Sequence, residues 1–198
     1  MIVHTIHAGN IVLPDDSRIL DVGCGQDPVP EASVLLDRYL NYDGERLGPL
    51  RTLGKPFVLA DMHYLPFKDK SFDFIVSQGV VEHAENPALV CTEFSRVSHA
   101  GVMTLPTQLH ERISAWRYHK WFCVVENDVI HFIEKPLRLF PMRMEGEFLN
   151  FYHSHPGYFT LVYRWEDGIK YKVINFSTEA NFESYLELLR EGWGIVGR

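Results

Sequence analysis

The residues best suited to ligand chemistry are an acid and a glycine turn in the run Arg18-Ile-Leu-Asp-Val-Gly-Cys-Gly25. The apolar start of this run predicts a buried strand that ends in a turn made by Gly23, Cys24 and Gly25. Glycine leaves the backbone bare and tolerates positive φ, so a nucleotide-like ligand can approach closely. A carboxylate at Asp21 repels a diphosphate but attracts a cation, such as the amino group of an amino-acid-like cofactor. The pattern therefore favours S-adenosylmethionine over NAD.

Two further acids, and residues beside them, follow later apolar runs. Asp37 ends the second run, where a carboxylate can accept hydrogen bonds from both hydroxyls of a ribose; the competing interpretation is a solvated acid at a strand end. Asp61 ends the third run and can receive the adenine amino group, while the Met62 thioether can pack on the adenine ring. Ser77 and Gln78 follow the fourth run and are expected at the same sheet edge, on the floor of the pocket.

Three histidines and a glutamate are candidates for the acceptor side of such a site. His83 follows the fourth run and could take a proton from an oxygen or nitrogen nucleophile. An equally good interpretation is a histidine that begins a helix and bonds to backbone. His110, Glu111 and His119 follow the fifth run and could face a substrate, although each alone is more typical of a structural or exposed residue.

The glycine turn does not match the nicotinamide fingerprint Gly-x-Gly-x-x-Gly. Pro28 stands where that fingerprint has its third glycine, and Asp27 stands where a phosphate would need a helix N-terminus. These two residues disfavour a dinucleotide.

The cysteines and the paired histidines do not form a pattern typical of metal sites. Cys24, Cys91 and Cys123 are widely spaced and include no CxxC motif, which favours neither a disulfide framework nor a zinc site and indicates a reducing cytoplasm. His153 and His155 lie in an expected loop with no nearby cysteine or HExxH motif. We therefore expect no metal.

Five apolar runs of the kind found in parallel sheets covered on both faces must position these residues. We expect strands over Arg18–Val22, Val34–Asp37, Phe57–Asp61, Ser71–Ser77 and Gly101–Leu105. Only eight residues, Gln26 to Ser33, separate the glycine turn from the second strand, whereas a parallel crossover usually takes a dozen or more. The first helix is therefore expected to be a turn or to be missing.

Helices and hairpins are expected later in the chain. Asn86 and Pro87 begin a helix with an apolar stripe that reaches Val97, and a second helix has its stripe from Phe182 to Leu189. Turn signals predict two hairpins, which pair Trp121–Val125 with Val129–Ile133 and Tyr158–Trp165 with Ile169–Phe176.

Several motifs occur in the order typical of one enzyme family. The segments 21–25 (DVGCG), 61–75 (DMHYLPFKDKSFDFI), 81–87 (VEHAENP) and 93–97 (EFSRV) resemble class I S-adenosylmethionine-dependent methyltransferases. The resemblance covers about residues 18 to 107 and implies a Rossmann-like sheet. It also implies that Asp21, Gly23 and Gly25 surround the methionine moiety, Asp37 the ribose, and Asp61 and Met62 the adenine. Asp27 replaces the third glycine common in that family, and His119-Lys-Trp121 is shared with an uncharacterised subgroup.

Composition limits the class of protein and its partners. The 198 residues are 46% apolar and 23% charged, which predicts a single soluble domain with a small insertion at about 108–157. A net charge of −7 argues against nucleic acid or an anionic membrane as partner, and no apolar run is long enough to span a bilayer.

We thus expect an α/β protein with a mostly parallel, Rossmann-like sheet, an antiparallel terminal hairpin and helices on both faces. The expected activity is methyl transfer from S-adenosylmethionine to a small-molecule acceptor. Two alternatives are a catalytically silent S-adenosylmethionine-binding partner or regulator and, less favoured, an NAD(P)-dependent oxidoreductase. The acceptor atom and the oligomeric state are left open.

Overall fold

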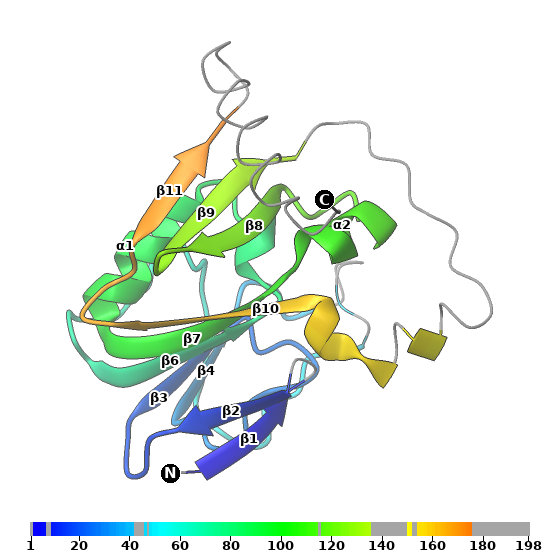
Figure 1. Ribbon diagram of the computed structural model, residues 1–198. Coiled ribbons are helices and arrows are strands. Elements are labelled where there is room, and N and C mark those ends of the chain that lie inside the picture. The colour runs from blue at the N-terminus through cyan, green and yellow to red at the C-terminus, as the bar shows by residue number, and fades with distance from the viewer. Residues whose placement is uncertain are drawn as a thin grey trace, which may run out of the picture.

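A six-stranded sheet forms the centre of the computed structural model, which describes residues 2–6, 9–41, 46, 48–114, 116–135, 150–151 and 154–175 (Figure 1). Its strand order is β10-β7-β6-β3-β4-β5. The strands are β3 (Ile19–Val22), β4 (Val34–Asp37), β5 (Phe57–Leu59), β6 (Phe72–Gln78), β7 (Ser98–Pro106) and β10 (Thr160–Glu166). The first five in chain order pair in parallel, and β10 runs antiparallel to β7.

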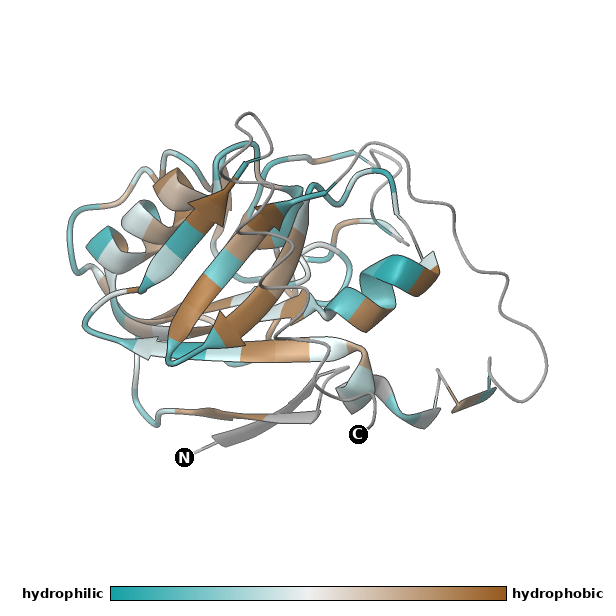
Figure 2. Ribbon diagram, turned by 45° about the horizontal axis from the view of Figure 1, so that its top comes forward, coloured by the Kyte–Doolittle hydropathy of each residue, from teal (hydrophilic) through white to brown (hydrophobic). Residues whose placement is uncertain are grey.

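This arrangement confirms the mostly parallel α/β fold, and all five strands expected from the apolar runs are present. The runs are continuous because the sheet is covered on both faces: every residue of β3 is buried, and so are six successive residues of β7. Figure 2 shows hydrophobic residues concentrated in the strands, while the connecting loops are mostly hydrophilic.

Helix α1 (Pro87–Val97) and a second sheet cover one face of the central sheet. The Asn86 side chain caps α1 by accepting a hydrogen bond from the Leu89 amide at 3.1 Å, as expected. The second sheet has the order β11-β9-β8, from β8 (Trp121–Glu126), β9 (Val129–Glu134) and β11 (Tyr171–Ile174). Phe94 of α1 and Phe132 of β9 are fully buried in the same hydrophobic cluster.

A hairpin that was not predicted covers the other face. Strands β1 (Ile2–Ile6) and β2 (Gly9–Leu13) pair antiparallel, and Ile11 and Leu13 belong to a cluster with residues of β3, β4, β6 and β7. The loop between β3 and β4 contributes Val29 to the same cluster. That loop contains no helix, so the first crossover is reduced to turns, as its length indicated.

The first predicted hairpin is confirmed and the pairing of the second is wrong. Strands β8 and β9 pair antiparallel across Asn127 and Asp128, which both have positive φ, as a tight hairpin turn requires. Strands β10 and β11 form where expected, but β10 pairs with β7 and β11 pairs in parallel with β9. The open edge of β7 takes β10 instead, because Trp165 can then be buried across from Gly101.

The remaining described elements are short. They are the 3-10 helix η1 (Val81–His83), helix α2 (Gln108–Ser114) and the 3-10 helix η2 (Pro156–Tyr158). The expected helix with its stripe from Phe182 to Leu189 lies outside the described residues. No helix within the described ranges is long and apolar enough to cross a membrane.

Candidate functional site

Two adjoining cavities of about 360 Å³ each lie where the parallel strands end. The first is lined on the β4 and β5 side by Asp37, Asp61 and Met62. The second extends toward α2 and is lined by residues that include Asp21 and Gln78. Gly23, Gly25, Arg46, Gly79, His83 and Tyr118 line both. The carboxyl ends of neighbouring parallel strands thus meet around one hollow, the usual ligand position in open α/β sheets.

The glycine turn after β3 is fastened to the end of β4. The amides of Gly23 and Cys24 donate to the Leu36 carbonyl oxygen at 2.8 and 3.1 Å, and the Gly25 amide donates to Asp37 Oδ2 at 3.0 Å. Gly23 has φ of +75°, and a Cβ there would lie 2.8 Å from Val80 Cγ1. Only glycine fits this position, both in conformation and in space.

Asp37 keeps acceptor capacity toward the first cavity. Its Oδ1 accepts a hydrogen bond from the Tyr39 amide at 2.9 Å, its Oδ2 accepts one from Gly25, and Arg46 Nη1 lies 3.8 Å from Oδ2. A carboxylate can accept about four hydrogen bonds, so positions are left for hydroxyls of a ligand. Sequence reasoning missed Arg46, because a lone arginine between two strands carries no pattern.

His63 keeps the Asp61 carboxylate at the first cavity ionised. The sequence did not predict a role for His63 in the site. Oδ1 accepts a hydrogen bond from the His63 amide at 2.9 Å and lies 2.6 Å from Nδ1 of that ring, while Oδ2 is 3.4 Å from Arg38 Nε. Partial burial raises the pKa of Asp61, but these contacts outweigh it and lower the pKa below its ordinary value. The Asn86 amide donates to His63 Nε2 at 3.2 Å, so the ring's proton lies on Nδ1, toward Asp61.

Asp21 is buried at the second cavity, and its Oδ2 accepts a hydrogen bond from the Val29 amide at 2.8 Å. Burial raises the pKa of Asp21 to about 7, and the charges of Asp37 and Asp27 add to the rise. A cation beside it would favour the ionised form. Its neighbour Cys24 also lines this cavity, and burial raises the pKa of that thiol to about 12, so it is no nucleophile at neutral pH.

Ser77 and Gln78, the two residues predicted on the floor of the pocket, differ in their positions. Gln78 lines the second cavity, whereas Ser77 is 1% exposed and lines neither. The Ser77 hydroxyl oxygen has no hydrogen-bond partner among the described residues.

A polar cluster joins η1, α2 and the loop before β8. It contains the four predicted acceptor-side residues, His83, His110, Glu111 and His119, together with Glu82. His119 Nδ1 makes a short contact with Glu111 Oε1, and Lys135 Nζ pairs with the other carboxylate oxygen of Glu111. His119 Nε2 lies 4.0 Å from Glu82 Oε1.

Burial shifts the ionisation of this cluster. It raises the pKa of Glu82 to about 7, and it lowers the pKa of His110 below its ordinary value. Burial also raises the pKa of Glu111, but the contacts with His119 and Lys135 outweigh it and keep that pKa low. Glu82 directly precedes His83, yet nothing in the sequence showed that its side chain is buried.

The other histidine pair is only partly described. His155 is exposed and its ring stacks on Phe151, with centroids 4.3 Å apart, and His153 lies outside the described residues.

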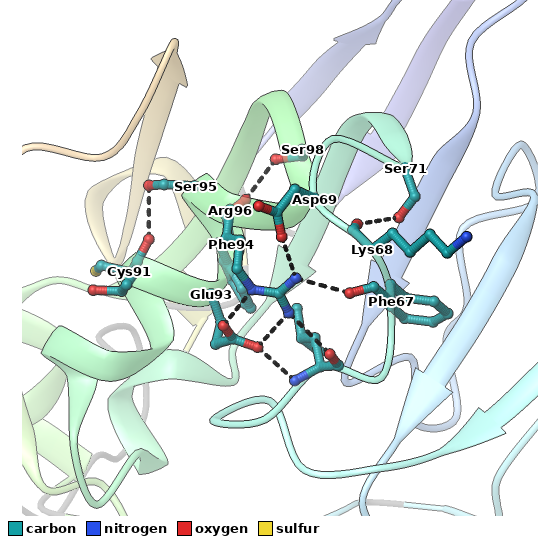
Figure 3. Close-up of polar contacts among 12 residues, drawn as sticks. Phe67, Lys68, Asp69, Ser71, Cys91, Glu93, Phe94, Ser95, Arg96 and Ser98 are labelled. Atoms are coloured by element: carbon teal, nitrogen blue, oxygen red, sulfur yellow. Dashed lines mark hydrogen bonds and ion pairs between the residues drawn. The ribbon is translucent and has the colours of Figure 1, made fainter.

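Arg96 and Glu93, from a motif in α1, secure the loop that follows β5 (Figure 3). Arg96 donates to the carbonyl oxygens of Leu65 and Phe67 at 3.0 and 2.8 Å. Glu93 accepts from Arg96 Nε at 2.7 Å and from the Leu65 amide at 2.8 Å. These motif residues are therefore structural, and the loop that they hold contains Asp61 and Met62.

Known proteins share this part of the chain. A family described as a methyltransferase domain matches residues 20–104, which confirms the resemblance for this segment. A relative described as an uncharacterized methyltransferase of Schizosaccharomyces pombe is 32% identical over 102 residues. That match spans 42% of this chain and only 37% of the length of the relative.

Two solved structures are more distantly similar. A SAM-dependent methyltransferase from Thermotoga maritima is 19% identical with a TM-score of 0.38, over 48% of this chain and 45% of that one. The YcgJ protein from Bacillus subtilis is 18% identical with a TM-score of 0.35, over 46% of this chain and 44% of that one.

Proposed function

We propose that the chain transfers a methyl group from S-adenosylmethionine to a small-molecule acceptor, because residues 20–104 match a methyltransferase domain. The observation that carries the proposal is the meeting of Asp21, Asp37 and Asp61 around one glycine turn at the edge of the sheet. Three acids at this edge suit a cofactor with an ammonium group, a ribose and an adenine, and they repel a diphosphate.

Each acid has a separate part in this proposal. Asp21 would face the amino group of the methionine moiety, Asp37 would accept the ribose hydroxyls, and Asp61 with Met62 would contact the adenine. Gln78 would lie beside the methionine moiety, and the glycine turn would let the cofactor approach the backbone. The sulfonium is already activated, so the residues have to hold the acceptor in line, exclude water and, for an oxygen or nitrogen acceptor, take its proton.

The second cavity supports a small acceptor. Its volume of about 360 Å³ suits a compact molecule, and its wall includes the rings of Trp116, Tyr118 and His119. We place the acceptor-selecting residues in the segment 108–157, and His83 is the candidate base because it lines both cavities. The net charge of −7 disfavours a nucleic-acid acceptor.

We also propose that the protein lies in the cytoplasm. Cys24, Cys91 and Cys123 are free and buried, which fits the cytoplasm as a reducing compartment.

The test is a calorimetric titration of the purified chain with S-adenosylhomocysteine, with NADH as the control ligand. We expect micromolar binding of S-adenosylhomocysteine alone. Binding of NADH alone would favour the oxidoreductase, and binding of neither would contradict the proposal. Labelled S-adenosylmethionine and a panel of hydroxyl, amine and carbon acceptors then separate an enzyme from a catalytically silent binder.

A further inference from the structure

Three of the five side chains in the polar cluster have their possible ligand atoms close together. One carboxylate oxygen of Glu82 and one ring nitrogen each of His83 and His119 all lie within 4.8 Å of one another. Two imidazoles and a carboxylate are the ligand set of many zinc sites. The sequence did not reveal this set because His119 is far from the adjacent pair Glu82-His83.

Glu82 is the observation that separates this cluster from an ordinary polar patch. The side chain is 2% exposed, and its Oε2 atom has no hydrogen-bond partner among the described residues. A buried carboxylate oxygen without a partner is costly, and a cation is one of the few groups that can offset the cost.

His119 is oriented as metal-bound histidines usually are. Its Nδ1 atom contacts Glu111 and Glu111 is paired with Lys135, so Nε2 is left to face Glu82. A metal-bound histidine commonly donates its second ring N–H to a carboxylate, which fixes the tautomer and raises the basicity of the ligating nitrogen.

Backbone and indole hydrogen bonds bring the two ligand segments together without any ion. The Lys120 amide donates to the Glu82 carbonyl oxygen at 2.8 Å, and Trp121 Nε1 donates to the Ala84 carbonyl oxygen at 2.7 Å. Zinc–nitrogen distances of about 2.0–2.1 Å put two ligands of a tetrahedral site roughly 3.3 Å apart. The ligand atoms, which lie within 4.8 Å of one another, therefore have to approach by at most about 1.5 Å.

We propose that Glu82, His83 and His119 bind one divalent transition-metal ion of the zinc type, with Glu111 as a positioning residue. Nitrogen ligands favour such an ion over Mg²⁺, which prefers oxygen. Three protein ligands leave an open coordination position, and all three line the second cavity.

The open position suggests what the ion does, and this part rests on the proposed methyl transfer. A hydroxyl of the acceptor bound there would lose its proton to water more readily, since a metal lowers the pKa of bound oxygen. The oxygen would then form a bond to the methyl carbon while the carbon–sulfur bond breaks and its electron pair stays on sulfur. His83 is in this case a metal ligand and not a base.

The test is a titration of the untagged, chelator-treated chain with Co²⁺, followed by its visible absorption, and then displacement by Zn²⁺. We expect one Co²⁺ per chain, with the intense bands of a low-coordinate site. His119→Asn retains a donor for Glu111 but removes the Nε2 ligand, and Glu82→Gln conserves the shape of the side chain. Each should weaken Co²⁺ binding at least about tenfold, and Glu111→Gln should weaken it roughly 10–100-fold.

His99→Gln is the matched control, because His99 is an exposed histidine on β7. It should bind Co²⁺ as the wild type does. No micromolar Co²⁺ or Zn²⁺ binding by the wild type would overturn the proposal, as would unchanged binding by folded Glu82→Gln and His119→Asn. S-adenosylhomocysteine titrated into the same samples keeps the two proposals apart: metal binding without cofactor binding overturns only the proposed function, and the reverse overturns only the metal site.

Discussion

The guanidinium of Arg96 donates from Nη2 to the carbonyl oxygen of Leu65 at 3.0 Å, across 31 positions of the chain. The same side chain reaches the Phe67 carbonyl, the Asp69 carboxylate and Glu93. Helix α1, on the face of the sheet, thus fixes the loop that contains Asp61 and Met62, two residues that line the first cavity. Arg96 and Glu93 lie outside the cavities, and they influence the first cavity through this loop.

Replacing Arg96 should therefore destabilise the protein and weaken its cofactor site. We expect Arg96→Ala to lower the free energy of unfolding by about 1.5–3 kcal/mol, because charged hydrogen bonds are lost. Arg96→Lys should restore little, since an ammonium cannot reproduce the planar fork. Urea unfolding measures the free energy of unfolding of both variants, and Lys68→Ala, at an exposed position, is the neutral control. If Arg96→Lys were as stable as the wild type, the planar guanidinium of Arg96 would not be needed for stability.

Gly23→Ala should abolish binding of S-adenosylhomocysteine, because the added Cβ would collide with Val80 and the backbone has positive φ. Gly157→Ala is the matched control, as a Cβ there meets nothing within 4 Å. Calorimetry gives the affinity, and thermal unfolding shows whether each variant is folded. Wild-type affinity in Gly23→Ala would mean that the glycine turn does not form the pocket.

Asp37→Ala should weaken binding of S-adenosylhomocysteine by about 1–3 kcal/mol, through the loss of charged hydrogen bonds to the ribose. Part of the loss in affinity would come from the glycine turn, because Asp37 also accepts a hydrogen bond from the Gly25 amide. Adenine alone has no ribose, so Asp37→Ala should weaken the binding of adenine less than that of S-adenosylhomocysteine. An equal loss for both ligands would instead indicate that the glycine turn has collapsed. The exposed acid Glu126, changed to Gln, serves as control. Equal binding by Asp37→Ala and the wild type would remove Asp37 from the site.

The raised pKa of Asp21, about 7, predicts that binding of S-adenosylhomocysteine depends on pH. Only the ionised carboxylate attracts the ammonium group, so affinity should rise roughly tenfold between pH 6 and pH 8. Asp21→Asn should bind more weakly and lose most of this dependence. Calorimetry across that range makes the comparison, and an equally steep profile in Asp21→Asn would assign the titration to another group.

Stability should change with pH in the opposite direction. The pKa of Asp21 is raised in the folded state from 3.8 to about 7, so the unfolded chain loses this proton first as pH rises. The stability that Asp21 contributes is full below about pH 4 and is lost by about pH 7. The free energy of unfolding of Asp21→Asn, compared with that of the wild type at several pH values, should not show this component.

The sequence allowed prediction of the parallel strands, because an apolar run such as Ile19 to Val22 is a local signal for a doubly covered sheet. The glycine turn and the acids that follow the strands were also readable, since their spacing is local. The α1 cap at Asn86 was predicted for the same reason.

Features that depend on distant partners were not predicted. The pairing of β10 depends on the open edge of β7, some 60 positions away, and no turn residue encodes that choice. The burial of Glu82 and its approach to His119 depend on the hydrogen bond between Lys120 and Glu82. Arg46 and His63 are single polar residues in loops, and only the folded chain shows that they contact Asp37 and Asp61.

Gly101 has a consequence for the behaviour of the protein in concentrated solution. A Cβ at this position would lie 2.7 Å from the Ile75 carbonyl oxygen and would overlap the Trp165 indole, so even alanine would push β10 away from β7. The amide and carbonyl groups of β7 would then be free to pair with a strand from another molecule. The missing side chain at position 101 thus allows β10 to cover the edge of β7.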